Sequence, residues 1–283
     1  IDDKFNFIED EEERSVQNML RYDSGIRDYT GSLEWEYVPS PSHYVRAGTQ
    51  FILHHFRPEA FHFSENAENQ SPIFPSAMIK TTEAALYVED EWRPVKQLTL
   101  NGGLRFSTFH AKGKTYTTID PRFSARYLLN ENSSVKVGYS RMQQYIHLLS
   151  NNSLFFQTDL WVPVTDKVRP MNSSQYSLGV HQSVHKQFDF SVETYYKTMQ
   201  NVIEYKDGAS FSGSPISWED KVEAGKGRSY GVEFSLEKRS GRLTGTAAYA
   251  WSKTERQFNE INDGEWFPAR FDRRHTANIY LSY

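Results

Sequence analysis

The sequence contains no cysteine among its 283 residues, so disulfide bonds and thiolate metal sites are excluded. It also has no run of about 18 apolar residues, the length that a transmembrane helix needs. The formal net charge is −4, and a chain without a basic excess has no broad attraction for nucleic acid. We therefore expect no nucleic-acid partner.

Sequence motifs of common catalytic centres are missing as well. There is no phosphate-binding glycine loop, no H-E-x-x-H zinc motif and no Ser/His/Asp arrangement. Carboxylates do occur two residues apart, as in Glu34 and Glu36, which places them about 7 Å apart on one face of a strand, near the spacing in glycosidases. Such pairs recur, for example at Glu89 and Glu91, and so indicate a generally charged face. We expect no enzymatic activity, no cofactor and no bound metal.

The sequence is rich in aromatic side chains although it is polar on average. Phe, Trp and Tyr make up 15% of the residues, while the mean hydropathy is −0.68. This combination fits a soluble β protein with a large binding surface. It fits equally well a membrane β-barrel, whose strands are apolar on one side only and whose rims carry aromatic girdles.

Alternating apolar and polar residues predict an all-β fold, an antiparallel up-and-down meander. In one hairpin, Val232, Phe234 and Leu236 point to one side of a strand, while Glu233 and Ser235 point to the other. We count eleven such segments, and most have about the ten residues that a tilted strand needs to cross a bilayer. They fall near residues 30–38, 43–57, 81–93, 97–109, 120–130, 133–142, 172–183, 187–205, 227–239, 241–254 and 272–283.

The predicted connections alternate between short polar turns and long loops. In a meander every second connection lies on the same rim, so one rim carries tight turns and the other carries long loops. Outer-membrane barrels have this asymmetry, whereas a soluble sandwich has no physical reason for it. The predicted long connections lie near residues 58–80, 110–119, 143–171, 206–226 and 255–271.

Charged side chains keep to one face of the predicted strands. An Arg or Lys that faces the middle of a bilayer costs roughly 2–4 kcal/mol, so in a membrane barrel this face has to line the lumen and the apolar face has to meet lipid. The predicted lumen-facing residues are Glu34, Glu36, Arg105, Arg122, Arg126, Glu193 and Glu233.

Several stretches resemble TonB-dependent receptors of the outer membrane. They are AALYVEDEWRPVKQLTLNGGLRFS (84–107), residues 120–150 and residues 191–211. The most specific is GKGRSYGVEF (225–234), followed by RQFNEINDGEWFPARFDRRHTANIYLSY (256–283). This last part is similar to the Bacteroidetes class, which carries a carboxypeptidase-regulatory-like domain before its plug.

The resemblance implies that residues 1–283 form one partial barrel domain without a plug. A full barrel of this family has about 22 strands around a plug domain, and eleven segments are counted here. We therefore expect earlier strands and a plug before Ile1, and further strands after Tyr283. An open sheet of this kind should show unpaired edges.

The resemblance also implies a location in the cell outer membrane and the energy-coupled uptake of a scarce solute, of the siderophore, vitamin, glycan or peptide class. The expected partners are outer-membrane lipid, the protein's own plug and missing strands, a TonB-type energy-coupling complex that acts through the N-terminal part, and a solute-binding lipoprotein. Two alternatives stay open at this point. One is a passive porin-like barrel, and the other is a soluble carbohydrate-active β-sandwich.

Candidate ligand-binding residues lie in the predicted loops. Aromatic rings suit stacking on sugars or aromatic ligands, and a dense basic group suits anions, although the same residues can pack the loops together or form an internal salt-bridge network. The candidates are Trp161, Trp218, Trp266, Phe267, Arg270, Arg273, Arg274 and His275, with Phe155, Phe156 and Phe211 as further loop aromatics.

Two other groups are interpreted as structural. The acidic run at residues 9–13 is typical of a solvated charge run rather than of a cation site. His54 and His55 cannot chelate one metal ion together, because neighbours on a strand point to opposite faces. His62 lies nearby but is not expected to complete such a site.

The face assignment predicts how two arginine substitutions behave. Val232→Arg should impair barrel assembly, because an arginine in the middle of the bilayer costs roughly 2–4 kcal/mol. Ser235→Arg should be tolerated, because that side of the strand is wet. The heat-modifiable mobility of the folded barrel on a gel measures assembly, and equal assembly of the two variants would contradict a membrane barrel.

Overall fold

The computed structural model describes residues 3–7, 18–65, 70–74, 78–150, 159–185, 187–206, 209 and 217–283. Eleven long strands account for most of these residues, and each overlaps one of the predicted segments, so the prediction of an all-β antiparallel meander is confirmed. They are β2 (Asn18–Ser40), β3 (His43–Glu65), β5 (Ile79–Val95), β6 (Leu98–Ala111), β7 (Lys114–Asn130), β8 (Ser133–Gln144), β11 (Met171–Val184), β12 (Phe188–Tyr205), β13 (Val222–Lys238), β14 (Thr244–Gln257) and β16 (His275–Ser282).

Shorter elements lie mostly in the segments predicted as loops. They are β1 (Asp3–Phe7), β4 (Gln70–Phe74), β9 (Ile146–Ser150), β10 (Asp159–Pro163), β15 (Phe267–Pro268) and the single 3-10 turns η1 (Trp218–Asp220) and η2 (Asn262–Gly264). Within the described ranges, no helix has the length and apolar character needed to cross a membrane.

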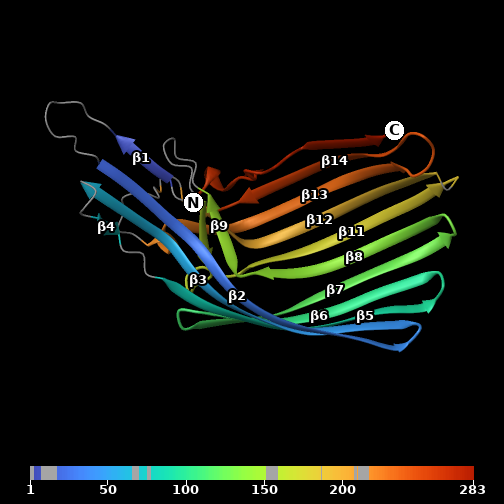
Figure 1. The fold of residues 1–283 in the computed structure, drawn as a ribbon, viewed down its shortest axis with the longest axis horizontal. Helices are drawn as coiled ribbons and strands as arrows, with labels where there is room; N and C mark the ends of the chain where they lie inside the picture. Colours follow the sequence, from blue (N-terminus) through green and yellow to red (C-terminus); the bar gives the residue numbers. More distant parts are fainter. Residues whose placement is uncertain are drawn as a thin grey trace.

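The strands form one antiparallel sheet of 14 members. Each long strand pairs with the next one along the chain, from β2 to β16 (Figure 1). Among the strands described, no pairing joins β16 to β1 or β2, so the sheet has two open edges. The expectation of unpaired edges is confirmed.

The register of β13 and β14 fixes the faces of their hairpin. Val232 lies opposite Trp251, and Phe234 lies opposite Tyr249, so the apolar side chains of both strands share one face. Glu233 is on the other face. The strands are joined by residues 239–243, which include Gly241 at a φ of +103°, a conformation that glycine adopts without strain.

The two ends of the sheet differ as predicted (Figure 1). We call them the turn rim and the loop rim. The loop rim holds the segments that contain β4, β9, β10, η1, η2 and β15. The turn rim holds the five short connections, residues 41–42, 96–97, 131–132, 185–187 and 239–243.

One predicted loop is wrong. Residues 110–119 do not form a long connection, because β6 continues to Ala111 and β7 begins at Lys114. The two-residue turn between them has Lys112 at φ +44° and Gly113 at φ +78°. Two central residues with positive φ are typical of tight hairpin turns, so the polar residues here make a turn rather than a loop.

The segment predicted as a loop at residues 143–171 contains an inward hairpin. β9 pairs with β10 as a separate two-stranded sheet. β9 contacts β12, while β10 contacts β2 and β3. In the order of the large sheet, β3 and β12 are separated by β5, β6, β7, β8 and β11. One hairpin can touch strands so far apart only from inside the curve of the sheet, so it lies on the concave side (Figure 1).

Candidate functional site

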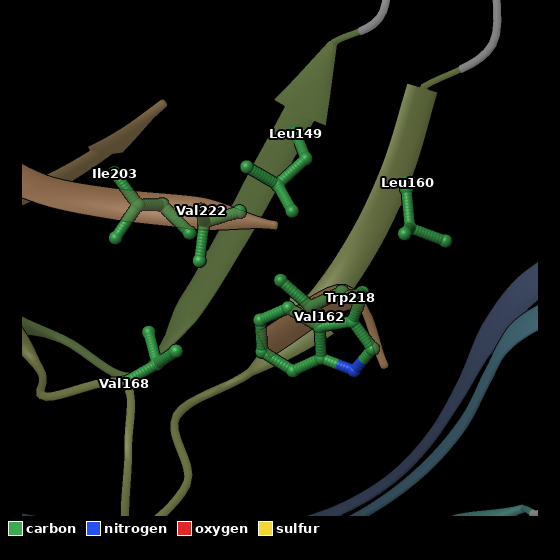
Figure 2. Packing of buried hydrophobic residues seen from close by; sticks show 7 residues of the cluster. All are labelled: Leu149, Leu160, Val162, Val168, Ile203, Trp218 and Val222. Carbon is green, nitrogen blue, oxygen red and sulfur yellow. The ribbon is translucent and has the colours of Figure 1, made fainter. Parts of the chain in front are cut away.

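A buried apolar cluster at the loop rim fixes the inward hairpin. Its members come from both hairpin strands, the segment after β10, the end of β12, η1 and the start of β13. Figure 2 shows the ring of Trp218 beside Val162 of β10. Truncating a buried leucine or tryptophan in such a cluster costs about 2–5 kcal/mol. The cluster consists of Leu149, Leu160, Val162, Val168, Ile203, Trp218 and Val222.

A second contact joins the start of the hairpin to β6. The rings of Phe109 and Tyr145 stack with their centroids 4.9 Å apart, and the Ser107 and Tyr145 hydroxyls are 2.9 Å apart. Ser107 and Phe109 share a strand face with Arg105 because they are separated by even numbers of residues. Since the hairpin lies inside the curve, this charged face of the sheet is the concave one.

Two ion pairs connect η1 to neighbouring turns of the loop rim. Lys112 Nζ in the β6–β7 turn lies 3.0 Å from Glu219 Oε1. Lys167 Nζ, after β10, donates to Asp220 Oδ1 at 2.6 Å, and this hydrogen bond raises the pKa of Lys167. Both pairs are partly exposed, so their contribution to stability is small.

His147 of β9 is buried within the hairpin contact. It is 4% exposed, and its Nε2 atom has no hydrogen-bond partner among the described residues. Burial lowers the pKa of His147 to about 4, because an apolar environment disfavours the charged form, while a hydrogen bond with the Arg169 backbone opposes the shift. The docked hairpin therefore holds a neutral histidine.

His54 lies on the concave face of β3 and is only 2% exposed. Its Nδ1 atom is 2.8 Å from Asp28 Oδ1, and its Nε2 atom is 3.7 Å from Glu83 Oε2. His55 points to the convex side, where its ring contacts Tyr29 edge-on. The two histidines therefore point to opposite faces of β3, as the strand alternation predicts.

Polar contacts cross the concave face between β2 and β5. The Tyr87 hydroxyl donates to Glu34 Oε2 at 2.5 Å. Gly48 makes room for this contact, because a Cβ atom there would lie 2.5 Å from the Tyr87 ring. A larger residue at position 48 would displace Tyr87 and leave Glu34 without its donor.

The same face forms an open pocket of about 370 Å³. Arg105 Nη2 donates to Gln50 Oε1 at 2.8 Å, and Arg46 forms an ion pair with Glu89. Arg122 also lines the pocket. Because the pocket presents charges of both signs, it suits a polar solute rather than an apolar one.

A second open pocket, of about 340 Å³, lies between β12, β13, β14 and β16. Glu193 and Glu233 face each other across β12 and β13 as register partners, and both line the pocket with Thr276 and Asn278. Two carboxylates in this arrangement repel each other, and the pocket lining contains no Lys or Arg, so this pocket is acidic.

The structure places all seven residues predicted to face a lumen on the concave side. The strand register shows this, because each of the seven residues lies on the same strand face as a residue that lines a concave pocket, or on the same face as Ser107. Glu34, Arg105 and Arg122 line the first pocket, which we call the mixed pocket. Glu193 and Glu233 line the second, acidic pocket. Glu36 and Arg126 lie on the same concave face but outside these two linings.

The predicted loop aromatics do not come together in one site. Trp218 is buried in the hairpin cluster, whereas Trp161 is 41% exposed on β10. Phe267 stacks on Phe258 at 5.9 Å, and Trp266 lies 4.3 Å from the Arg228 guanidinium. Trp161 is thus the one of these four whose ring is largely open to solvent.

The predicted basic segment before β16 is tied to β14. Arg274 Nε is 3.1 Å from Asp272 Oδ2, and Asp272 Oδ1 accepts a hydrogen bond from the Thr254 backbone. His275 bonds the Tyr249 hydroxyl at 2.7 Å, on the convex side. Arg270 lies over the Phe271 ring, and Arg273 is exposed. Of these basic residues, Arg274 thus forms an ion pair within the segment, while Arg270 packs on a ring.

Some of the predicted candidate residues lie outside the described part of the chain. Some described residues of the site, in turn, are not predicted from the sequence. Outside the described part are the acidic run 9–13, Phe155, Phe156, Phe211 and the side chain of His62. The sequence reasoning missed the inward hairpin, including Tyr145 and His147. The alternation after Tyr145 is a strand signal, but only the fold shows that this strand turns inward.

Comparison with known proteins identifies a family. The model of the family "TonB dependent receptor-like, beta-barrel" matches residues 2–283. No curated protein sequence matches the chain. The family match covers nearly every residue, but it does not test the similarity of residues 225–234 and 256–283 to the Bacteroidetes class, which stays a prediction.

Solved structures share the fold at low sequence identity. The FrpB iron transporter from Neisseria meningitidis has a TM-score of 0.64 and 13% identity over 94% of this chain and 42% of that one. The Pseudomonas aeruginosa ferripyoverdine receptor has a TM-score of 0.60 and 15% identity over 95% and 37%. The copper transporter OprC has a TM-score of 0.64 and 14% identity over 89% and 40%. The chain thus spans about two fifths of their length.

Protonation of His147 is expected to release the inward hairpin. Its pKa of about 4 in the docked hairpin is below the ordinary value of about 6.5, so the released hairpin binds more protons and docking weakens as the pH falls between these values. Nitroxide labels on Leu148 and Asn130 should show a broader distance distribution at about pH 4.5 than at about pH 7.5. In a His147→Leu background the distribution should not change with pH, and equal broadening there would contradict the assignment.

Proposed function

The chain belongs to the family of TonB-dependent receptor-like β-barrels, and on this premise we propose that the whole protein takes up a scarce solute with energy coupling. The observation that carries the proposal is the inward hairpin, which crosses the concave face at the loop rim. A solute that enters between the loops meets this hairpin and the polar face below it, rather than an open water-filled channel.

The chain lies in the cell outer membrane, as barrels of its family do. Its convex face meets lipid, because an exposed apolar surface of this extent requires an apolar environment. Family geometry places the turn rim toward the periplasm and the loop rim toward the outside. Exposed apolar side chains on the convex face include Leu33, Phe51, Leu86, Leu104, Phe123, Val137, Leu178, Phe190, Phe234, Tyr249 and Ile279.

Further strands and a plug domain are proposed to complete the barrel. The support is physical: an open sheet edge in lipid exposes unpaired backbone N–H and C=O groups, and each costs several kcal/mol. β2 and β16 carry such edges among the described strands. Closure at about 22 strands is the family geometry, and residues 1–283 would then be one partial barrel domain.

The concave face is proposed to guide a polar solute. The mixed pocket offers Arg46, Arg105 and Arg122 beside Glu34 and Glu89, so it can bind groups of either charge. Solved structures with this fold include an iron transporter, a ferripyoverdine receptor and a copper transporter. Metal-bearing solutes are therefore the first class to test, before vitamins, glycans and peptides.

The proposed cycle involves no covalent chemistry and no cofactor of the protein itself. Family members are receptors and transporters. An energy-coupling complex of the TonB type would act on the plug from the periplasm, and a surface lipoprotein would deliver solute at the loop rim. Exposed Trp161 on β10 and Arg273 near β14 are the candidate residues best placed to touch an arriving solute.

An uptake panel tests the proposal. Cells that make the protein are given radiolabelled ferric siderophores, cupric ion and cobalamin. Entry of one member should require the protein and stop when an uncoupler removes the proton gradient. Entry of several solutes according to size alone, with no effect of the uncoupler, would instead show a passive pore.

The role of the hairpin is tested by Trp218→Ala. Loss of this ring removes the centre of the hairpin cluster, at a cost of about 3–5 kcal/mol, and should weaken binding of the accepted solute at the cell surface by about tenfold or more. Trp92→Ala is the matched control, because Trp92 is 42% exposed on the convex face at the turn rim. Loss of binding in both variants, or in neither, would contradict a specific role for the hairpin.

A further inference from the structure

One row of the concave face carries two cations followed by two anions. Arg126 of β7 is the register partner of Lys136 on β8, and Glu193 of β12 is the partner of Glu233 on β13. Gly179 of β11 lies between the two pairs, as the partner of both Lys136 and Glu193. The five strands lie side by side in the sheet (Figure 1). We call these five residues the bipolar row.

The order of charges in the bipolar row does not stabilise the sheet. Like charges that lie directly opposite each other on neighbouring strands are destabilising, and the row contains two such pairs. Alternating signs along the same row would turn both repulsions into attractions. The order of charges therefore points to a ligand rather than to folding.

Several other charges on the concave face are paired. Arg46 forms an ion pair with Glu89, and Arg256 Nη1 lies 2.7 Å from Glu204 Oε2. Within the part of the chain that the structure describes, the four charged side chains of the bipolar row form no ion pair with one another or with any other residue. All four are exposed on the concave side. Their charges are therefore available to a molecule in the lumen.

A glycine separates the two charge pairs. A Cβ atom at Gly179 would lie 3.1 Å from Glu193 Cγ, so the glycine leaves the middle of the row without a side chain of its own. Neighbouring strands are about 4.8 Å apart, so the Cα atoms of Lys136 and Glu193 are about 10 Å apart. An extended chain of three residues also spans about 10 Å. The acidic pair borders the open pocket of about 340 Å³, which has room for an ammonium group.

We propose that the bipolar row binds a linear zwitterion whose carboxylate and ammonium ends are about 10 Å apart, the length of a tripeptide. The carboxylate accepts charge-assisted hydrogen bonds from Arg126 and Lys136, and the ammonium group donates to Glu193 and Glu233. Such a ligand offsets both repulsions at once. The inference rests on the proposed function, because it takes the concave face as the path of the solute, and it adds the charge pattern of that solute.

Blocking the ends of a peptide one at a time tests the proposal. The whole protein, purified in a nonionic detergent, is titrated with triglycine, with its C-terminal amide, with its N-acetyl form and with the form blocked at both ends. Triglycine should bind most tightly, and each block should weaken binding by about tenfold. The affinity for triglycine should also fall as salt rises. Equal affinities for the four probes would overturn the proposal.

Two double variants assign the ends of the ligand. Arg126→Gln with Lys136→Gln should no longer distinguish the free acid from the amide, but should still distinguish the free amine from its acetylated form. Glu193→Gln with Glu233→Gln should show the reverse. Each double variant removes a repulsion, so heat-modifiable gel mobility should show full assembly. Lys197→Gln is the control, because Lys197 lies on the same face of β12 outside the row, and it should keep both distinctions.

An unchanged pattern in a folded double variant, or the same loss in both, would show that the bipolar row does not bind the two ends. A plug that occupies the row gives a different result. The double variants would then make the plug sensitive to protease while the four probes bind alike, which would overturn the proposal. Binding by the purified protein needs no proton gradient, so its outcome is separate from that of the uptake panel. Distinction among the probes without energy-coupled uptake would contradict the proposed function alone, and energy-coupled uptake without distinction would contradict this inference alone.

Discussion

The structure depends on one constraint, which is that a strand crossing lipid has to keep its charges on a single face. Side chains alternate along a strand, so the constraint fixes every second residue of each long strand. Arg46 and Glu89 satisfy it as a pair on the concave face. Where the convex face does carry charge, it does so near a rim, as with Asp90, which accepts a hydrogen bond from His43 at the turn rim.

Both faces of the sheet change polarity at the loop rim. The concave face is charged along most of its length but becomes apolar at Phe56, Phe109 and Ala111, all 0% exposed. The convex face is apolar along most of its length but becomes basic at Arg27 and Lys80. The reason is the same on both sides: beyond the lipid, the outer surface meets headgroups and water, while the inner surface has to pack against the inward hairpin.

The alternation of apolar and polar residues predicts the strands well, because it depends only on the surroundings of the two faces of each single strand. The faces of the hairpin that contains Val232 and Trp251 follow directly from it. The error at residues 110–119 arose because Lys112 and Gly113 give the same polar signal in a long loop and in a tight turn. Only the pairing of Ala111 with Lys114 distinguishes the two.

The site was harder to predict, because it depends on contacts between distant segments. Nothing local to Tyr145 or His147 shows that Tyr145 packs on β6 and that β9 folds inward onto β12. The sequence predicts Trp218 as a residue for ligand contact, yet Trp218 is 6% exposed and packs against the hairpin. An aromatic residue in a loop has the same sequence pattern whether it binds a solute or holds the loop in place.

The central claim is that the concave face is wet and the convex face lies in lipid. Nitroxide labels placed one at a time at positions 231–236 of β13, in the native membrane, test it through their collisions with oxygen and with a water-soluble nickel complex. The account predicts that Val232, Phe234 and Leu236 collide mainly with oxygen, while Glu233 and Ser235 collide mainly with the nickel complex. A profile without this two-residue period, or with the opposite phase, would contradict it.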